Sequence, residues 1–395
     1  MLDYQTALAT VLASATPLPA VERPLGVAHG LVLAEPVIAR WHLPRTDNAA
    51  MDGFAVVSAA ASGCLPIVGA AYAGHPMTGE VNAGSAVRIT TGAPIPAGCD
   101  AVVPIEQATE TAAGVTLQVA PHPGDHIRRQ GEEYRCGETL LEAGTLLRAG
   151  EIGLIASAGG AQVKVYPRPR VAVISTGDEL VELGQEPGSG QIVNSNLYHL
   201  AARIRECGGE VLPLGIGGDH PGGIEALIDA GRQADLCVST GGVSVGERDF
   251  VREALKRCGF TQKFWKVAIK PGKPVLFGTI DGKPCYGLPG NPAAAAATFE
   301  LFVRPALRRL GGHRAVLAAT RSGRLVETVR GDRKRQAFLW CRLEWVGDGY
   351  QVEVTQRQGS GQTRSLQGAN ALLPVPIGVE AVAAGTTVDV LLLDY

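Results

Sequence analysis

The sequence lacks several patterns that would place it in a familiar class of protein. Its eight cysteines are scattered, with no C-x-x-C pair and no zinc spacing, so we expect neither a disulfide framework nor a structural zinc site. No apolar stretch reaches the roughly 18–20 residues that span a bilayer. The opening Met-Leu-Asp carries no basic segment of the kind that begins a signal peptide. These absences predict a cytoplasmic protein with no membrane segment.

An excess of charge of one sign is also missing. The formal net charge is −2, so no general attraction to nucleic acid is predicted. Short basic clusters at 128–129 and 333–335 are typical of a solvated surface, with anion binding as the alternative. Nucleotide fingerprints are absent as well, because no G-x-x-x-x-G-K-[ST] occurs and the glycines of GGVSVG (241–246) do not have dinucleotide-binding spacing. An NAD site is therefore disfavoured.

Glycine and proline, by contrast, are abundant, at 51 and 25 of 395 residues, and hydrophobic residues make up 46%. This composition indicates a folded chain with many short elements, and the length indicates several domains. An amphipathic helix is predicted over residues 2–14. We predict four parts: an N-terminal helical/β composite (1–44 and 141–167), a β-rich module (45–140), an α/β domain (168–314) and a C-terminal β-barrel or sandwich (315–395). The predicted fold class is α/β plus β.

The α/β prediction comes from clean alternation of strand and helix patterns between 168 and 312. Apolar runs at 170–176, 210–216 and 235–240 read as buried strands, and each is followed by a helical pattern. The helix after the first strand is predicted to begin at Asn194 or Ser195 and to end at Gly208. Asp281-Gly282 predicts a hairpin turn, and a long helix follows residue 291. Such alternation specifies a doubly wound sheet.

Polar loops follow two of these strands with the same design, Ser-Thr-Gly and then carboxylates. In open α/β sheets, the groups just past the strand ends line the ligand crevice. Loops rich in Gly, Ser and Thr expose backbone N–H groups that suit phosphate or another oxyanion. The alternative is a structural strand-to-helix turn. The candidate binding residues are Ser175, Thr176, Gly177, Ser239, Thr240, Gly241, Gly242, Ser244 and Gly246, with the tight turn Pro289, Gly290, Asn291 and Pro292 as a third loop.

Carboxylates cluster at the same predicted edge of the sheet, at Asp178, Glu179, Asp219, Glu247 and Asp249. Hard oxygen ligands without nearby histidines suit Mg²⁺ that is held jointly with substrate phosphates. Helix capping is the ordinary alternative, above all for Asp249.

Lysines gather in WKVAIKPGKPV (265–275). A strand here would place Lys266 and Lys270 on one face, where two like charges repel unless an anion lies between them. Lys273 follows closely. We favour an anion site, with a lysine-protected edge strand as the alternative.

Seven motifs, in order along the chain, resemble those of the molybdopterin molybdenumtransferase family, MoeA and the gephyrin E domain. They are NAAMDGFAV (48–56), TTGAPIPAGCDAVV (90–103), RRQGEE (128–133), STGDEL (175–180), STGGVSVGERDF (239–250), AIKPGKP (268–274) and GLPGNP (287–292). The resemblance covers essentially the whole chain. It implies an elongated four-part subunit that forms a homodimer, with the doubly wound part as the molybdopterin-binding domain. The family reaction inserts molybdate into the dithiolene of adenylyl-molybdopterin and releases AMP, with Mg²⁺ required.

Residue roles carried over from this resemblance fall on matching positions. The family's acids correspond to Asp52, Glu179, Asp219 and Asp249, of which the last three would hold the metal. Its motif threonine, lysines and prolines correspond to Thr91, Lys266, Lys270, Pro289 and Pro292, and two late positions correspond to Arg335 and Ser360. Many relatives carry Asp where this chain has Glu133, so that carboxylate is one methylene longer here.

The resemblance also implies partners. The loops at 48–53 and 90–94 are expected to complete the site of the other subunit of the homodimer, and transient contact with a molybdopterin adenylyltransferase is expected. Two alternatives stay open: the protein is itself that adenylyltransferase, or it is a non-catalytic molybdopterin-binding scaffold. No nucleic acid or membrane partner is expected, and tungstate is not distinguished from molybdate.

Overall fold

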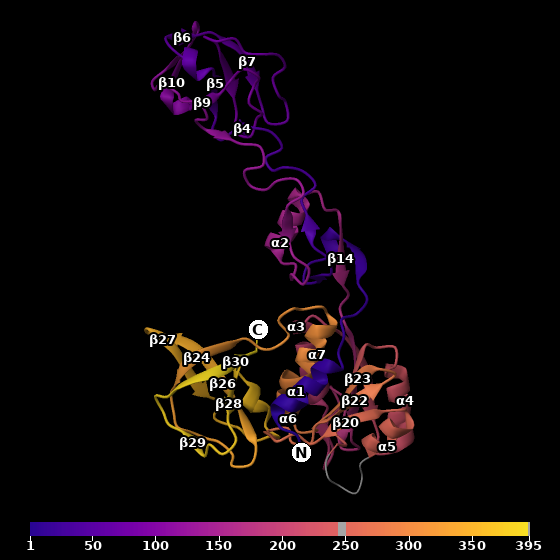
Figure 1. Ribbon diagram of the computed structural model, residues 1–395. Coiled ribbons are helices and arrows are strands. Elements are labelled where there is room, and N and C mark those ends of the chain that lie inside the picture. The colour runs from indigo at the N-terminus through magenta and orange to yellow at the C-terminus, as the bar shows by residue number, and fades with distance from the viewer. Residues whose placement is uncertain (244–249, 394–395) are drawn as a thin grey trace.

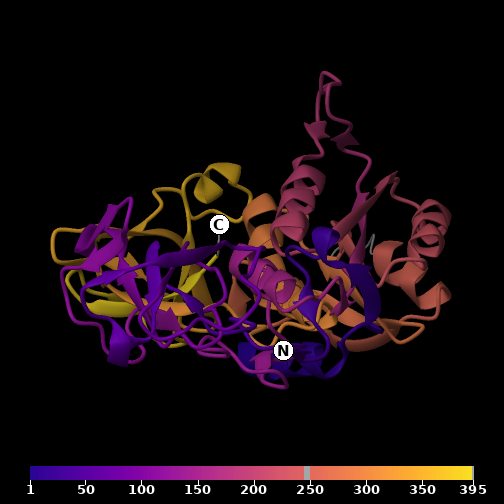
Figure 2. The same cartoon turned by 90° about the horizontal axis from the view of Figure 1, so that it is seen from above.

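The computed structural model describes residues 1–243 and 250–393, and it has four parts. Figure 1 shows a β-rich module at one end, a small composite of strands and one helix in the middle, and an α/β domain beside a β-barrel at the other end. Figure 2, seen from above, shows the barrel and the α/β domain side by side. The subunit is therefore elongated and multidomain, as the sequence predicts. No helix within the described residues has the length and apolar character needed to cross a bilayer.

The β-rich module contains a four-stranded sheet in the order β7-β8-β5-β9. Alternate side chains of its central strand point to two separate apolar cores, Phe54 and Val56 to one and Ala55 to the other, as the two-residue period of a strand requires. The strands are β5 (Gly53–Val56), β7 (Ile67–Ala71), β8 (Ala86–Ile89) and β9 (Ala101–Pro104), with β4 (Asn48–Ala49) paired to β12 (Ile127–Arg128), and β6 (Cys64–Leu65), β10 (Ala108–Thr111) and β11 (Gly114–Leu117) in a second sheet.

The composite part joins residues from two separate stretches of the chain. Its strands are β1 (Val21–Pro24), β2 (Val32–Leu33) and β14 (Gln162–Tyr166) in one sheet and β3 (Val37–Ile38) with β13 (Thr139–Leu141) in another, and its helix is α2 (Ala149–Ser157). The first helix of the chain does not belong to this part.

That first helix, α1 (Tyr4–Ala13), begins after Asp3, whose side chain accepts a hydrogen bond from the Thr6 N–H at 2.9 Å. Its buried face packs in the core of the α/β domain, and the Tyr4 ring contacts Phe302 and Phe338. The sequence prediction grouped residues 1–44 with the composite, and for this helix the structure corrects it. The amphipathic pattern predicts that a face is buried, but it does not say against which surface.

The α/β domain contains a six-stranded sheet in the order β18-β15-β19-β23-β22-β20. The first four strands are parallel to one another, β22 runs antiparallel to β23, and β20 runs antiparallel to β22. Helices α3, α6 and α7 cover one face, together with α1, and α4 and α5 cover the other. The predicted doubly wound sheet is confirmed. Its strands are β15 (Arg170–Thr176), β18 (Glu210–Gly217), β19 (Leu236–Thr240), β20 (Thr261–Trp265), β22 (Leu276–Ile280) and β23 (Lys283–Leu288); a short parallel pair, β16 (Leu180–Val181) and β17 (Ile192–Val193), lies beside them.

Local signals in this domain behave as predicted. Helix α3 (Ser195–Glu206) begins after Asn194, whose side chain accepts from the Leu197 N–H, and Gly208 follows its end with a φ of 84°. The other helices are α4 (Pro221–Gly231), α5 (Phe250–Arg257), α6 (Pro292–Thr298) and α7 (Arg304–Leu310), the last two joined by a π-helical turn at Phe299–Val303. Asp281 and Gly282 both have positive φ, 51° and 77°, as a type I′ hairpin requires.

The C-terminal part is a closed barrel, because β26 pairs with both β27 and β28. The sequence predicted either a β-barrel or a β-sandwich for this part, and the structure shows the barrel. The barrel strands are β24 (Thr320–Leu325), β26 (Gln336–Val346), β27 (Gly349–Val354), β28 (Ala371–Val375) and β30 (Thr387–Leu392), with β25 (Val329–Arg330) and β29 (Ala381–Val382) as a separate pair. Strand β21 (Ile269–Lys270) reaches across from the α/β domain and pairs with β26. Backbone pairing therefore joins the two parts.

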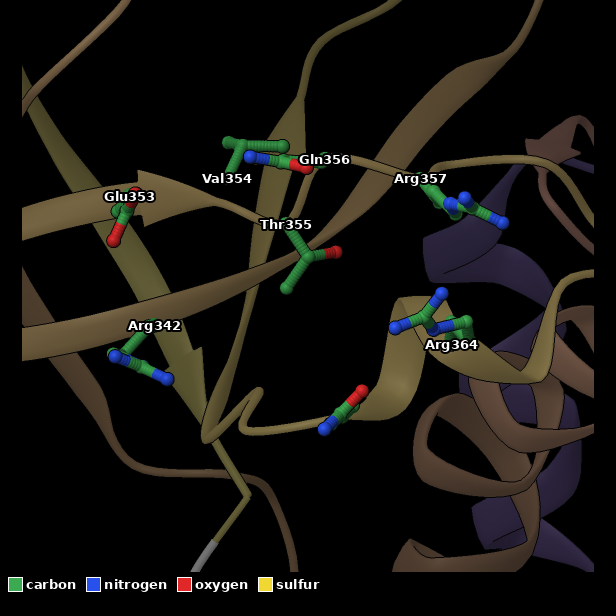
Figure 3. Close-up of a pocket in the computed structure, with 8 residues that line it drawn as sticks. Arg342, Glu353, Val354, Thr355, Gln356, Arg357 and Arg364 are labelled. Atoms are coloured by element: carbon green, nitrogen blue, oxygen red, sulfur yellow. The ribbon is translucent and has the colours of Figure 1, made fainter.

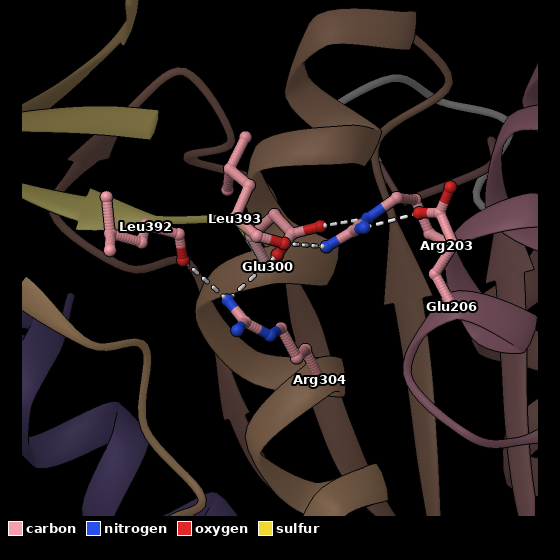
Figure 4. A network of polar contacts seen from close by, with 6 residues as sticks. All are labelled: Arg203, Glu206, Glu300, Arg304, Leu392 and Leu393. Carbon is pink, nitrogen blue, oxygen red and sulfur yellow. Dashed lines mark hydrogen bonds and ion pairs between the residues drawn. The ribbon is translucent and has the colours of Figure 1, made fainter. Parts of the chain in front are cut away.

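A buried ionic network fixes this junction more firmly (Figure 4). The carboxylate of Glu300, placed by the π-helical turn, accepts from Arg203 Nε at 2.7 Å and from Arg304 Nη1 at 3.4 Å. The same two guanidinium groups donate to the carbonyls of Leu393 and Leu392, at 2.9 and 3.1 Å. Each charged side chain is at most 4% exposed. The last strand of the barrel is thus held against the α/β domain by charges that have no access to water.

We expect Glu300→Gln to lower the free energy of unfolding by about 3–5 kcal/mol, because it removes the buried carboxylate that two buried guanidinium groups share. Glu206→Gln is the matched control. Its carboxylate also contacts Arg203 but is 42% exposed, so about 1 kcal/mol or less is expected. Urea denaturation of both variants measures the difference, and equal losses would contradict the role assigned to burial.

Candidate functional site

The carboxyl ends of β15 and β19 lie next to each other in the sheet, and their hydroxyl groups hold the loop ends together. Ser175 Oγ donates to Asn194 Oδ1 at 2.9 Å, Thr176 Oγ1 donates to the Thr240 carbonyl at 3.1 Å, and Ser239 Oγ donates to the Tyr286 carbonyl at 3.3 Å. The Ser and Thr side chains are buried. Each of the three donating hydroxyls thus has a protein acceptor, so these residues shape the loops from within.

Glycine is required at position 241, where the second loop approaches the end of β15. Gly241 has a φ of 91°, and a Cβ there would lie 2.5 Å from the Thr176 carbonyl oxygen. A Cβ on Gly290 would lie 3.4 Å from the Gly241 Cα, so the third predicted loop touches the second. Asn196 Nδ2 donates to the Gly290 carbonyl at 2.7 Å and ties this loop to α3.

One pocket lies at the carboxyl edge of the sheet. Thr176 and Thr240, the last residues of β15 and β19, line it together with Glu179 from the first loop and Gly290 and Pro292 from the third; the helix start at 194–196 and residues 180, 192 and 193 complete the lining. The sequence prediction that these loops meet is consistent with this geometry.

Two predicted acids belong to adjoining strand ends. Asp219, which follows β18, donates its backbone N–H to Asp178 Oδ1 at 2.9 Å. The Glu179 carboxylate folds back against Gly177, where a Cβ would lie 2.2 Å from Glu179 Oε2. Of the other predicted residues, Ser244, Gly246, Glu247 and Asp249 lie outside the described residues. Within residues 1–243 and 250–393, no three acidic, histidine or cysteine side chains form a ready metal site.

The prediction that one strand carries Lys266 and Lys270 on the same face is wrong. β20 ends at Trp265, and Lys266 has a φ of 69°, so Lys266 and Lys270 do not alternate along one strand. The Lys266 ammonium lies 3.6 Å from the centroid of the Trp265 ring, on which Arg252 also stacks at 4.2 Å. Trp265 Nε1 donates to the Val243 carbonyl at 3.2 Å, which holds Val243 against the end of β20. The alternating pattern could not reveal a turn at a non-glycine residue.

Lys270 lies instead at the boundary with the barrel. Its ammonium is 3.5 Å from Asp332 Oδ2, and Arg335 Nη2 donates to the same oxygen at 2.9 Å. Lys273 is exposed nearby on the turn that follows Pro271. Two residues predicted separately, one from each domain, thus share one carboxylate. Sequence reasoning missed Asp332, because a single Asp in a basic segment carries no signal of its own.

Ser360 lies against the third loop. Asn291 Nδ2 donates to Ser360 Oγ at 3.0 Å, and the Ala294 N–H donates to the Ser360 carbonyl at 3.3 Å. A Cβ on Gly272 would come within 3.6 Å of the Ala294 carbonyl oxygen. Helix α6 therefore contacts both the turn that follows Lys270 and the loop that carries Ser360. A series of contacts thus runs from the third loop through Ser360 and α6 to the turn that follows Lys270.

Asp52 and Thr91 are the exception. The Thr91 N–H and Oγ1 donate to Asp52 Oδ1 at 2.6 and 2.8 Å, and the backbone hydrogen bond from Thr91 lowers the pKa of Asp52 below its ordinary value. Both residues lie in the β-rich module, at the opposite end of the subunit from the strand ends (Figure 1). In the same module, Glu133 is exposed and donates its backbone N–H to the Leu43 carbonyl. One chain alone therefore does not bring the two groups of predicted residues together.

A second, basic pocket lies on the barrel (Figure 3). Arg342 on β26, Glu353 on β27 and Arg364 on the short helix after residue 362 line it. Arg357 adds a third guanidinium from the loop that also carries Ser360. None of the residues predicted from the sequence lines this pocket.

A doubly wound domain with glycine-rich loops at its strand ends, set beside a β-barrel and preceded by a β-rich module, defines an elongated multidomain protein of the α/β plus β class. Three family models match successive segments of the chain, and these segments correspond to the parts of this architecture. They are the MoeA N-terminal region (domain I and II) at residues 2–159, the probable molybdopterin binding domain at 172–309 and the MoeA C-terminal region (domain IV) at 322–393.

Relatives agree with these matches along the whole chain. The molybdopterin molybdenumtransferase of a Nostoc species is 38% identical over 93% of this chain and 88% of its own, and molybdopterin molybdenumtransferase 2 of Mycobacterium tuberculosis is 36% identical over 98% of each. The crystal structure of a molybdopterin biosynthesis MoeA protein from Pyrococcus horikoshii superposes with a TM-score of 0.86 at 30% identity, over 100% of this chain and 99% of that one. The chain belongs to the molybdopterin molybdenumtransferase family.

Proposed function

We propose that this protein is a molybdopterin molybdenumtransferase that acts as a cytoplasmic homodimer. It inserts molybdate into the dithiolene of adenylyl-molybdopterin and releases AMP. The observation that carries the proposal is that strand-end loops and Glu179 line one pocket, while Ser360 joins the third loop to the barrel, where Lys270 and Arg335 share Asp332. A pyrophosphate-linked pterin and an oxyanion are both anionic, and this arrangement supplies the complementary groups.

The acids suit a divalent metal that arrives with the substrate. Asp219 and Glu179, at adjoining strand ends, are the hard oxygen donors that Mg²⁺ prefers, and Mg²⁺ commonly uses one or two carboxylates together with substrate phosphates. When bound, the metal would offset charge on the diphosphate and on departing AMP. Asp249, in the predicted metal set, lies outside the described residues.

The residues of this chain would act mainly by positioning. The Gly241 and Gly290 loops would seat the anionic part of the pterin, and Lys270 and Arg335 would hold the oxyanion at the barrel boundary. Holding two reactants in this way lowers the barrier without a covalent intermediate. Transient contact with an adenylyltransferase, the class of enzyme that makes this substrate, would deliver the reactive nucleotide.

A shared site in the homodimer would account for the position of Asp52 and Thr91. Their hydrogen-bonded pair lies far from the strand ends of its own chain, so a partner subunit in the opposite orientation would bring its module to this cleft. In this proposal, each site uses the α/β domain and barrel of one subunit and the β-rich module of the other.

The activity is tested by molybdate-dependent AMP release from adenylyl-molybdopterin. We expect Lys270→Gln to lower kcat/KM about tenfold to a hundredfold, because it removes a charge-assisted contact worth about 1.5–3 kcal/mol. Lys263→Gln, on the exposed edge strand β20, is the control and should match wild type. Pyrophosphate release from ATP and molybdopterin would instead identify an adenylyltransferase, and binding without turnover a scaffold.

Sharing of the site is tested by complementation. Asp52→Ala and Asp219→Ala subunits, co-expressed with different tags and purified as heterodimers, should regain activity, because one site per heterodimer then contains both native residues. Asp219→Ala paired with Glu179→Ala is the control. Both changes lie in the same domain, so every site stays defective and no activity should return. Equal activity in the two heterodimers would rule out a shared site.

A further inference from the structure

Asp332 occupies a central place in the loop between β25 and β26. Its Oδ1 accepts the backbone N–H groups of Lys334 and Arg335, at 3.0 and 3.1 Å. Its Oδ2 accepts from Arg335 Nη2 at 2.9 Å and lies 3.5 Å from Lys270 Nζ. The side chain is only 16% exposed. One carboxylate therefore organises its own loop and joins a cation from each of two domains.

Backbone pairing brings these cations to the same place. Lys270 pairs with Ala337 in the β21–β26 ladder, and the Gln336 N–H donates to the Ala268 carbonyl at 2.8 Å. Two positive side chains so placed would repel each other without an anion between them. Asp332 supplies that anion. The hydrogen bond from the Lys334 N–H, together with Arg335 and Lys270, lowers the pKa of Asp332 to about 2, so its carboxylate stays ionised throughout the neutral range.

Both cations keep donors for a ligand. The Lys270 side chain is 52% exposed and the Arg335 side chain is 31% exposed. A guanidinium has five N–H donors in a fixed fork, and the ion pair with Asp332 uses one of them. What remains is an ammonium and a guanidinium edge that contact the same carboxylate oxygen. This suits a small oxyanion that accepts several charge-assisted hydrogen bonds.

We propose that Asp332 is a positioning residue that holds Lys270 and Arg335 as a two-cation site for the tetrahedral oxyanion, molybdate, at the α/β–barrel boundary. The inference rests on the proposed function and extends it to a residue that no sequence pattern reveals. Asp332 does not touch the substrate. It acts through the two cations that do.

Removing the carboxylate has two opposing effects. It makes the boundary more positive, which would attract any anion, but at a partly exposed surface that attraction is weakened by solvent and salt. It also frees both cations to move apart, and hydrogen bonds to an oxyanion depend strongly on donor geometry. Since the second effect acts at contact distance, we expect it to dominate, so that the loss of Asp332 weakens oxyanion binding.

The test uses Asp332→Asn, which keeps an oxygen able to accept the backbone N–H groups of Lys334 and Arg335 and so preserves the turn. We expect the KM for molybdate in AMP release to rise about tenfold with kcat within about twofold, as loss of one charge-assisted contact predicts. Asp332→Glu, which restores the charge, should recover part of this loss. Glu380→Gln is the matched control: it removes an exposed carboxylate paired with Arg333 in the same part of the barrel, and its KM should not change.

Isothermal titration of wild type and variants with molybdate alone separates this inference from the proposed function. Weaker molybdate binding by Asp332→Asn supports the inference even if wild type releases no AMP, a result that would overturn only the proposed activity. An unchanged or lower dissociation constant in Asp332→Asn overturns the inference, whether or not wild type is active. A lower free energy of unfolding with unchanged molybdate binding also overturns it, because Asp332 would then be purely structural.

Discussion

The position of the barrel against the α/β domain is the constraint on which the site depends. Arg203 and Arg304 lie on helices of the α/β domain, and both reach past Glu300 to the final carbonyls of the barrel. Charges without access to water tolerate little displacement, because each lost contact leaves a buried ion unpaired. The buried ionic network and the β21–β26 pairing hold the barrel against the α/β domain. In this position Asp332 forms an ion pair with Lys270, and Ser360 accepts a hydrogen bond from α6.

The proposed site combines three kinds of group that one domain does not supply alone. The strand-end loops of the sheet would seat the anionic part of the pterin, and Gly241 allows the second loop to approach the end of β15 closely. Neighbouring strand ends provide the acids, and the junction with the barrel provides the paired cations. Placing a polyanion among them requires separate regions for metal, phosphate and oxyanion, which accounts for a site spread over two domains and, in the proposed dimer, a third.

The sequence predicted the features that depend on local pattern. The doubly wound sheet, the Asp281-Gly282 hairpin and the cap at Asn194 follow from strand length, turn chemistry and N-cap preference, and the structure confirms them. The sequence did not predict the features that depend on packing between distant segments. The docking of α1, the turn at Lys266 and the role of Asp332 are set by tertiary contacts, and no residue spacing along the chain encodes them.

In the proposed function, the oxyanion binds at the α/β–barrel boundary, between the strand-end loops and the barrel. Anomalous diffraction at the molybdenum edge, from crystals soaked in molybdate, locates the bound oxyanion. We expect a molybdenum peak within contact distance of Lys270 Nζ and the Arg335 guanidinium, on the side of α6 that faces Ser360. A peak confined to the basic pocket around Arg342 and Arg364, with none at the boundary, would rule out this binding site.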